Sequence, residues 1–185
     1  MSARTRPLIR LLAIATGLTF ASLGTAQHAR DTSMPMQSIL DYDKSRLVGN
    51  WYEVARSKSR IEQDCHGVTA DVETREDTRL TLKIECHKGS VSGPILNIDS
   101  ILVEVAPSVF ELRFVRFRAF GHQTLIVLWQ AEDDSAAAVG SLSGEFGWIW
   151  SKTATIAPET LELAREKLVE AGYRRQGIRP VQHGQ

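Results

Sequence analysis

Two cysteines are the strongest candidates for covalent chemistry in this sequence. Cys65 and Cys86 are the only cysteines among the 185 residues, and each could act as a thiolate nucleophile or pair with the other. They flank two runs that alternate between apolar and polar side chains, at residues 68–74 and 80–85, with a polar break at 75–79. This pattern is typical of an antiparallel hairpin, whose symmetry would place the two cysteines opposite each other. We therefore favour a disulfide, worth about 3 kcal/mol, and keep a free thiol nucleophile as the alternative.

Other catalytic chemistry finds little support in the sequence. The histidines do not form a ligand cluster such as two on one helical face; they are His28, His66, His87, His122 and His183. No Gly-x-Ser-x-Gly elbow, phosphate-binding loop or dinucleotide fingerprint occurs. We therefore expect no enzyme, no metal and no cofactor. The enzymatic alternative is an isomerase or a peroxide-reducing protein that uses Cys65 or Cys86 as its thiolate.

The first 26 residues have the composition of a secretory signal peptide. Three arginines precede an apolar run at residues 11–23, and small residues at 24–26 follow where a signal peptidase would cut. We expect a cleaved leader (1–26) and a soluble, exported mature chain, and the cysteines of an exported protein usually pair. Neither cysteine lies at the cleavage site, where a lipobox would need one. An uncleaved N-terminal anchor is the competing interpretation.

Charge and length limit the class of partner. Without the three arginines of the leader, 19 basic side chains remain against 22 acidic ones, a formal net charge of −3, so we expect no nucleic-acid partner. The remaining 159 residues are enough for one domain with one core. We expect the folded unit at residues 41–175, with a mobile N-terminal segment at 27–40 and a C-terminal tail at 176–185.

The region between residues 49 and 151 predicts eight strands in succession. Polar or Gly/Pro-containing breaks separate the runs, which we place at residues 50–56, 67–74, 80–87, 95–105, 109–118, 123–130, 136–141 and 146–151. Short consecutive strands favour an all-β, antiparallel, up-and-down meander. Eight such strands can close into a barrel whose interior suits one small ligand. A two-sheet sandwich is the structural alternative.

A change of period after the last strand predicts one α-helix. Pro158 fits the first helical position, and Gly172 is a plausible stop. Apolar side chains recur between them at spacings of three and four, namely Leu161, Ala164, Leu168 and Ala171. One apolar stripe of this kind can cover the outside of a barrel, whereas a sandwich rarely needs such a helix.

The first strand begins with the most specific motif of the chain. Gly49 precedes Asn50 and Trp51; a glycine ahead of a large aromatic lets the backbone turn sharply, and the tryptophan can plug one end of a closed sheet. An ordinary strand with a core tryptophan is the simpler interpretation, because Gly-x-Trp is a short pattern. Strand alternation puts Trp51, Glu53 and Ala55 on one face.

Taken together, these features resemble the lipocalin family and, within it, the bacterial lipocalins and their apolipoprotein-D-like relatives. The resemblance covers about residues 41–175. It is carried by four segments in order: GNWYEVAR at 49–56, Cys65 with VTA at 68–70, AVGS at 138–141, and GWIWSKT at 147–153 leading into Pro158. It implies an eight-stranded antiparallel up-and-down β-barrel with one C-terminal α-helix packed on the outside.

The chain departs from the family pattern at two places. The family usually has an arginine across the tryptophan of the first strand, and the matching residue here is Lys152. A lysine can approach the ring as a cation, although it lacks the flat guanidinium, so we assign closure of the barrel base to Gly49, Trp51 and Lys152. Family members often have a tyrosine shortly before the seventh strand, whereas residues 133–137 of this chain read DDSAA. This difference marks a different pocket in that region.

The resemblance implies that an apolar molecule enters the open end and contacts inward side chains. The candidates are Trp51, Glu53, Ala55, Val68, Ala70, Leu82 and Arg116. A buried Glu53 requires a hydrogen-bond partner or a raised pKa, and we favour a structural role over a polar spot in the pocket. The arginines of the fifth strand either meet an anionic ligand group at the mouth or face solvent, which we favour; they are Arg113, Arg116 and Arg118. We interpret Trp129, Trp148 and Trp150 as barrel wall or as cover beneath the helix.

We therefore expect a periplasmic or secreted lipocalin that binds a fatty acid, a lysophospholipid or a similar lipid, for storage, transport or membrane maintenance. The location in the periplasm rests on the resemblance to bacterial members. Peripheral association with the outer membrane and a homodimer stay open. A further alternative is a protein whose outer surface docks on an envelope partner, and it predicts a barrel interior filled by side chains.

Overall fold

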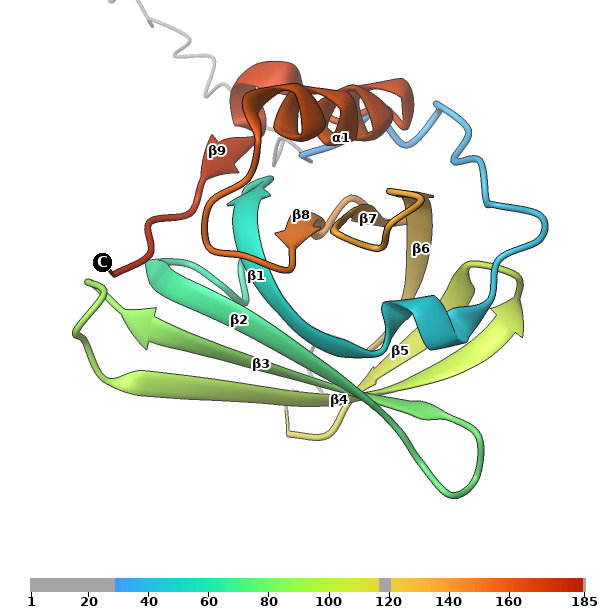
Figure 1. Cartoon of the computed structure of the whole chain (residues 1–185), viewed down its shortest axis with the longest axis horizontal. Coiled ribbons are helices and arrows are strands. Elements are labelled where there is room, and N and C mark those ends of the chain that lie inside the picture. The colour runs from blue at the N-terminus through green and yellow to red at the C-terminus, as the bar shows by residue number, and fades with distance from the viewer. Residues whose placement is uncertain (1–28, 117–120, 185) are drawn as a thin grey trace, which may run out of the picture.

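Eight strands of a nine-stranded antiparallel sheet close into a barrel in the computed structural model, which describes residues 29–116 and 121–184 (Figure 1). They are β1 (Gly49–Arg56), β2 (Cys65–Thr74), β3 (Leu80–Lys88), β4 (Ile95–Ala106), β5 (Val109–Phe114), β6 (His122–Gln130), β7 (Ala136–Ser141) and β8 (Gly147–Ser151). Each strand pairs with the next along the chain, and β1 pairs with both β2 and β8. The up-and-down barrel is thus confirmed, and the sandwich alternative is wrong.

Alternating side chains explain why these segments form the wall of a barrel. In β3, Leu80, Leu82, Ile84 and Cys86 are buried, whereas Lys83 and Glu85 between them are exposed. A period of two puts one set inside and the other in solvent. The sequence did not decide which face of β5 lines the interior. The same alternation answers this question, because the buried residues of that strand are Phe110, Leu112 and Phe114.

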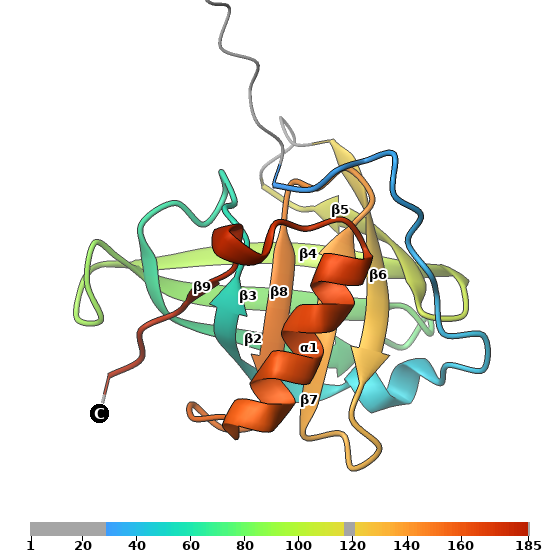
Figure 2. The same ribbon diagram turned by 90° about the horizontal axis from the view of Figure 1, so that it is seen from above.

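The helix follows the last strand as the sequence predicts. Helix α1 (Pro158–Glu170) begins with proline and buries Ala164 and Leu168 against the outer face of the sheet, where it crosses β7 and β8 (Figure 2). Gly172 follows with a φ of +93°, and a Cβ there would lie 2.6 Å from the carbonyl oxygen of Asp31. Glycine is therefore needed for both the left-handed backbone and the close approach.

Two apolar clusters hold the molecule together. The larger one fills the inside of the barrel and contains Trp51, Trp148 and Trp150. The smaller one lies between the barrel wall and α1 and contains Ala55, Ile149 and Leu168. The barrel therefore has a separate packing layer on each side of β7 and β8.

The segment before the barrel strands and the segment after α1 both contact the barrel. Arg30 is buried and donates from Nε to the carbonyl of Ala171 at 2.7 Å and from a terminal nitrogen to that of Leu142 at 2.9 Å. Near the other end, the short strand β9 (Arg179–Pro180) pairs with β1. Mobility of the terminal segments stays a prediction, and the expected signal peptide at 1–26 lies outside the described residues.

No helix among residues 29–116 and 121–184 is long and apolar enough to cross a bilayer.

Candidate ligand site in the barrel interior

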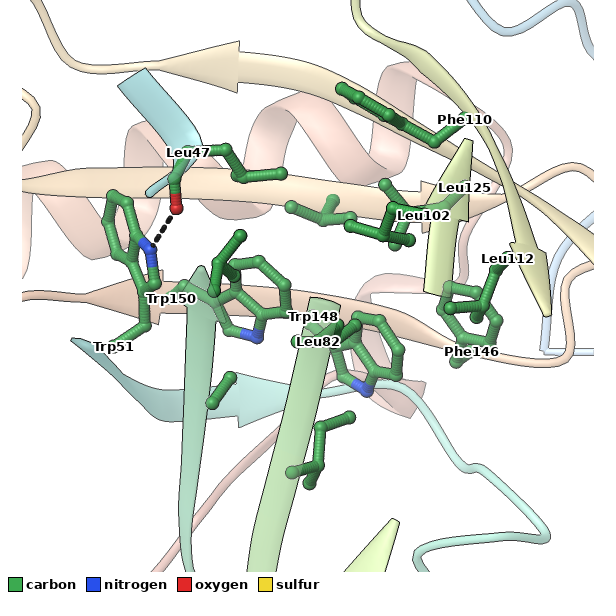
Figure 3. Packing of buried hydrophobic residues seen from close by; sticks show 14 of the residues in the cluster. Leu47, Trp51, Leu82, Leu102, Phe110, Leu112, Leu125, Phe146, Trp148 and Trp150 are labelled. Carbon is green, nitrogen blue, oxygen red and sulfur yellow. Dashed lines mark hydrogen bonds between the residues drawn. The ribbon is translucent and has the colours of Figure 1, made fainter. Parts of the chain in front are cut away.

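One end of the barrel is closed by Trp51. Its side chain is fully buried, and its Nε1 donates to the carbonyl of Leu47 at 2.8 Å (Figure 3) in the 3-10 helix Lys44–Leu47. Lys152 lies over the ring, with Nζ 3.6 Å from the centroid. Gly49 has a φ of +113°, and a Cβ there would lie 3.1 Å from that Nζ. The structure thus brings together the three residues that the sequence assigns to closure of the base.

A column of aromatic rings runs from this base toward the opposite end, which we call the mouth. The ring centroids of Trp51 and Trp150 are 6.1 Å apart, those of Trp150 and Trp148 are 5.5 Å apart, and those of Trp148 and Phe146 are 4.0 Å apart. Figure 3 shows these side chains projecting from β8 and its neighbours into one apolar space. Trp148 and Trp150 therefore face the interior and are not beneath the helix, whereas Trp129 packs with the outer cluster.

Other predicted ligand contacts also face the interior. Val68, Ala70 and Leu82 belong to the same buried cluster as the aromatic column, as the alternation of β2 and β3 requires. The remaining wall is apolar as well and includes Val72, Leu102, Leu112, Leu125 and Val139. The candidate site is therefore a continuous apolar lining that spans the barrel.

Two of the predicted ligand contacts, Ala55 and Arg116, are wrong because neither side chain faces the interior. A β-bulge between Glu53 and Ala55 shifts the register against β8, so that Glu53 pairs with Trp150 but Ala55 pairs with Ile149. An extra residue in a bulge reverses the alternation beyond it, which places Ala55 in the outer cluster beneath α1. Arg116 is exposed beyond the end of β5, because the strand stops at Phe114 before the arginine can point inward.

The other arginines of that region do not reach the interior either. Arg113 alternates with the buried residues of β5 and donates to Glu111 at 2.6 Å. Arg118 lies outside the described residues. Neither Arg113 nor Arg116 therefore belongs to the buried lining of the barrel.

Interior side chains fill the barrel almost completely. The buried members of the interior cluster are between 0% and 9% exposed, although the lining of a cavity wide enough for an acyl chain would be accessible to water. Close packing of this kind resembles an ordinary protein core. Binding inside the barrel therefore requires side chains to move.

Polar groups gather where the interior meets the mouth. Glu53 and Glu62 are each 1% exposed, and Glu53 accepts a hydrogen bond from Arg56 at 2.8 Å. Glu62 accepts one from Nε1 of Trp148 at 2.7 Å. Burial, followed by the neighbouring charge of Glu62, raises the pKa of Glu53 well above its usual value. Glu53 is thus hydrogen-bonded within the barrel.

Two members of this group, Arg56 and Glu62, are not predicted from the sequence. Glu62 lies in the connection between β1 and β2, where no periodicity marks a side chain as buried. It is nine positions along the chain from Glu53, and only the path of the loop brings the two carboxyl groups near each other. Arg56 could have been found, because it is three residues from Glu53 in the same strand.

The two cysteines form a disulfide that joins the start of β2 to the end of β3, with a Cα–Cα distance of 5.3 Å. The predicted pairing is confirmed. Because the chain has only these cysteines, the thiolate that the enzymatic alternative requires is not available in this state.

Hollows also lie outside the apolar interior in the described part of the chain. One, of about 390 Å³, adjoins the mouth between the β1–β2 loop and the C-terminal segment, and its lining includes Ser57, Glu62, Gln176 and Arg179. Another, of about 470 Å³, lies on the outside between α1, β6 and the N-terminal segment, and its lining includes Gln37, Trp129 and Lys167.

Comparison with known proteins agrees with this architecture. A family model described as a lipocalin-like domain matches residues 42–183. Outer membrane lipoprotein Blc of Escherichia coli (strain K12) is 25% identical over 151 residues, which cover 82% of this chain and 85% of that protein.

Solved structures agree in fold. The major allergen Per a 4 from cockroaches superposes with a TM-score of 0.63 at 16% identity, over 83% of this chain and 97% of that one. Lobster apocrustacyanin A1 gives a TM-score of 0.62 at 13% identity, over 82% and 91% of the two chains. At these identities the structures show a shared fold and no more.

Proposed function

The chain belongs to the lipocalin family, and from this membership we propose that it binds one small hydrophobic molecule, a fatty acid, a lysophospholipid or a similar lipid, in the interior of its barrel. The observation that carries the proposal is the apolar lining, which extends from Trp51 at the base to Phe146 near the mouth.

Desolvation would supply most of the affinity. An acyl chain that buries a few hundred Å² of apolar surface gains several kcal/mol at about 25 cal/mol per Å², before the ordering of ligand and protein is subtracted. Flat rings stacked along β8 offer broad contact to such a chain. Because the ligand-free interior is closely packed, part of this gain would be spent on displacing side chains.

The physiological setting is part of the proposal. Export by a cleaved signal peptide would place the protein in the periplasm or outside the cell. The Escherichia coli relative is named as an outer membrane lipoprotein, which supports a role in storage, transport or maintenance of membrane lipids and a peripheral association with the outer membrane. A homodimer is compatible with this role.

One observation favours a second candidate function. The filled interior is the arrangement expected of a barrel that serves as a rigid scaffold and presents its outside to an envelope partner. The outer hollow beside Trp129 and α1 would then be the first place to look for that partner.

Native mass spectrometry of protein purified from the exported fraction separates these candidates. The intact mass is compared with the mass after mild denaturation, before and after addition of palmitate or lysophosphatidylcholine. Release of a bound lipid on denaturation, or uptake of either probe, supports the proposed function. A protein that is empty and takes up neither probe would refute the proposed lipid binding and favour the scaffold function.

A further inference from the structure

The three tryptophans of the aromatic column differ in what their indole N–H groups contact. Nε1 of Trp51 donates to the carbonyl of Leu47 at 2.8 Å, and Nε1 of Trp148 donates to Glu62 at 2.7 Å. Nε1 of Trp150 is buried as well, but no atom of residues 29–116 and 121–184 accepts its hydrogen. The middle tryptophan of the column therefore holds a donor without an acceptor in the described part of the chain.

A buried donor of this kind is uncommon and unfavourable. The great majority of buried side-chain polar atoms in native proteins have a hydrogen-bond partner, and an N–H that lacks one destabilises the protein by the cost of its removal from water. The interior hydroxyl of Ser100, for comparison, donates to the carbonyl of Leu82 at 3.0 Å. Because the side chain of Trp150 is fully buried, a ligand oxygen that reached its N–H would remove this cost.

Trp150 lies away from both ends of the barrel. Its ring centroid is 6.1 Å from that of Trp51 at the base and 5.5 Å from that of Trp148 on the side of the mouth (Figure 3). Gly147, the first residue of β8, is three positions earlier in the strand, which corresponds to roughly 10 Å at the rise of a β-strand. An acyl chain that entered from the mouth would thus pass Trp150 with the middle of the chain and not with its headgroup.

The surroundings of Trp150 favour a neutral oxygen over an anionic one. Its direct partner across β1 and β8 is Glu53, which is buried, and the Cβ atoms of such a pair lie about 5 Å apart on one face. Arg56, which donates to Glu53 at 2.8 Å, also donates to the backbone carbonyls of Glu62 and Cys65. A ligand carboxylate at Trp150 would therefore approach another carboxyl group whose neighbouring cation is already engaged.

We propose that the indole N–H of Trp150 is a specificity-determining donor inside the barrel, and that the preferred ligand is a lipid with a neutral acceptor oxygen in the middle of its acyl chain. A ketone is the simplest group of this kind, because its oxygen accepts hydrogen bonds and brings no hydrogen that needs an acceptor of its own. The headgroup of the lipid stays at the mouth. This inference rests on the proposed function, because the lipid must first enter the interior.

Competition between two closely related lipids tests the inference. The probes are stearate and a stearate in which one CH₂ group at mid-chain is replaced by a ketone, and each is titrated against a bound fluorescent fatty acid. Burial of a carbonyl without a hydrogen bond is unfavourable, so an interior without a free donor prefers stearate. Because the ketone would pair with the N–H of Trp150, we expect the native protein to bind the keto lipid about tenfold more tightly than stearate.

The substitution Trp150→Phe keeps an aromatic ring in the column and removes the N–H. We expect this variant to bind stearate more tightly than the keto lipid. The matched control is Trp129→Phe, which makes the same substitution outside the barrel, where Trp129 packs with the outer cluster, and it should keep the native preference. A preference for the keto lipid that persists in Trp150→Phe would overturn the role of this donor.

A measurement on the native protein does not depend on the folding of a variant. Nuclear magnetic resonance follows the indole N–H signals, and a new hydrogen bond moves such a signal downfield. We expect the signal of Trp150 to move downfield with the keto lipid and not with stearate. Equal affinity for the two probes, with equal signals of Trp150, would overturn the inference and leave the proposed lipid binding intact, whereas binding of neither probe would refute both.

Discussion

Lys152 and Trp51 meet across the closed end of the barrel, with the lysine Nζ 3.6 Å from the centre of the indole ring. The same Nζ is 3.4 Å from the carbonyl of Val48. The pair joins the chain after β8 to the start of β1. Burial lowers the pKa of Lys152, because the ammonium lies partly out of water.

Replacement of Lys152 by arginine should stabilise the barrel. A guanidinium stacks on the ring and offers several donors where the ammonium acts as a point charge. Cation–π contacts contribute about 0.5–1 kcal/mol at partly exposed sites, so we expect Lys152→Arg to raise the melting temperature by about 2–4 °C and Lys152→Met to lower it. Thermal unfolding followed by circular dichroism measures both; equal melting temperatures for the three proteins would contradict this role for the charge.

Loss of the disulfide should destabilise the fold without abolishing the strand order. Cys65 and Cys86 are 21 positions apart, and closing a loop of that size restricts the unfolded chain by about 3 kcal/mol. The double variant Cys65→Ser/Cys86→Ser should therefore unfold at lower urea concentration. Reduction of the native protein with dithiothreitol should reproduce the shift and leave the double variant unaffected, whereas a shift in both would point to another cause.

A brominated lipid bound in the interior should quench the fluorescence of the tryptophans that face the interior. A fatty acid that carries bromine on its acyl chain quenches indole rings in contact with it, and Trp148 and Trp150 face the interior whereas Trp129 lines the outer hollow. We expect Trp129→Phe to retain most of the quenching seen in the native protein and Trp148→Phe to lose part of it. The reverse result would place the lipid on the outside of the barrel.

The free energy of unfolding should fall as pH rises from mildly acidic values. The pKa of Glu53 is raised in the folded state, chiefly by burial, so the folded protein holds a proton that the unfolded chain releases. The resulting stabilisation is complete below the unfolded pKa and is lost as pH rises through the folded pKa. Urea denaturation at a series of pH values measures the slope, which Glu53→Gln should flatten because it removes the titrating carboxyl; a native slope of opposite sign would refute the assignment.

Local patterns were enough to predict most of the fold. Alternation in segments such as β3, the breaks between strands and the proline at the start of α1 are properties of neighbouring residues, and they stay visible in one dimension. The predicted strand ends differ from the observed ones most clearly in β5, which stops at Phe114. Strand ends depend on the partner strand, so local pattern defines them least well.

The sequence by itself determined the number and order of the barrel strands, the outer helix, the pairing of Cys65 with Cys86 and the use of Trp51 at one end, because these follow from periodicity and spacing. Only the tertiary structure decided that a bulge places Ala55 outside the barrel, that side chains fill the interior, and that Glu62 meets Glu53. Each of these depends on how segments distant along the chain pack against one another, and packing is a property of three-dimensional distance that spacing along a chain does not encode.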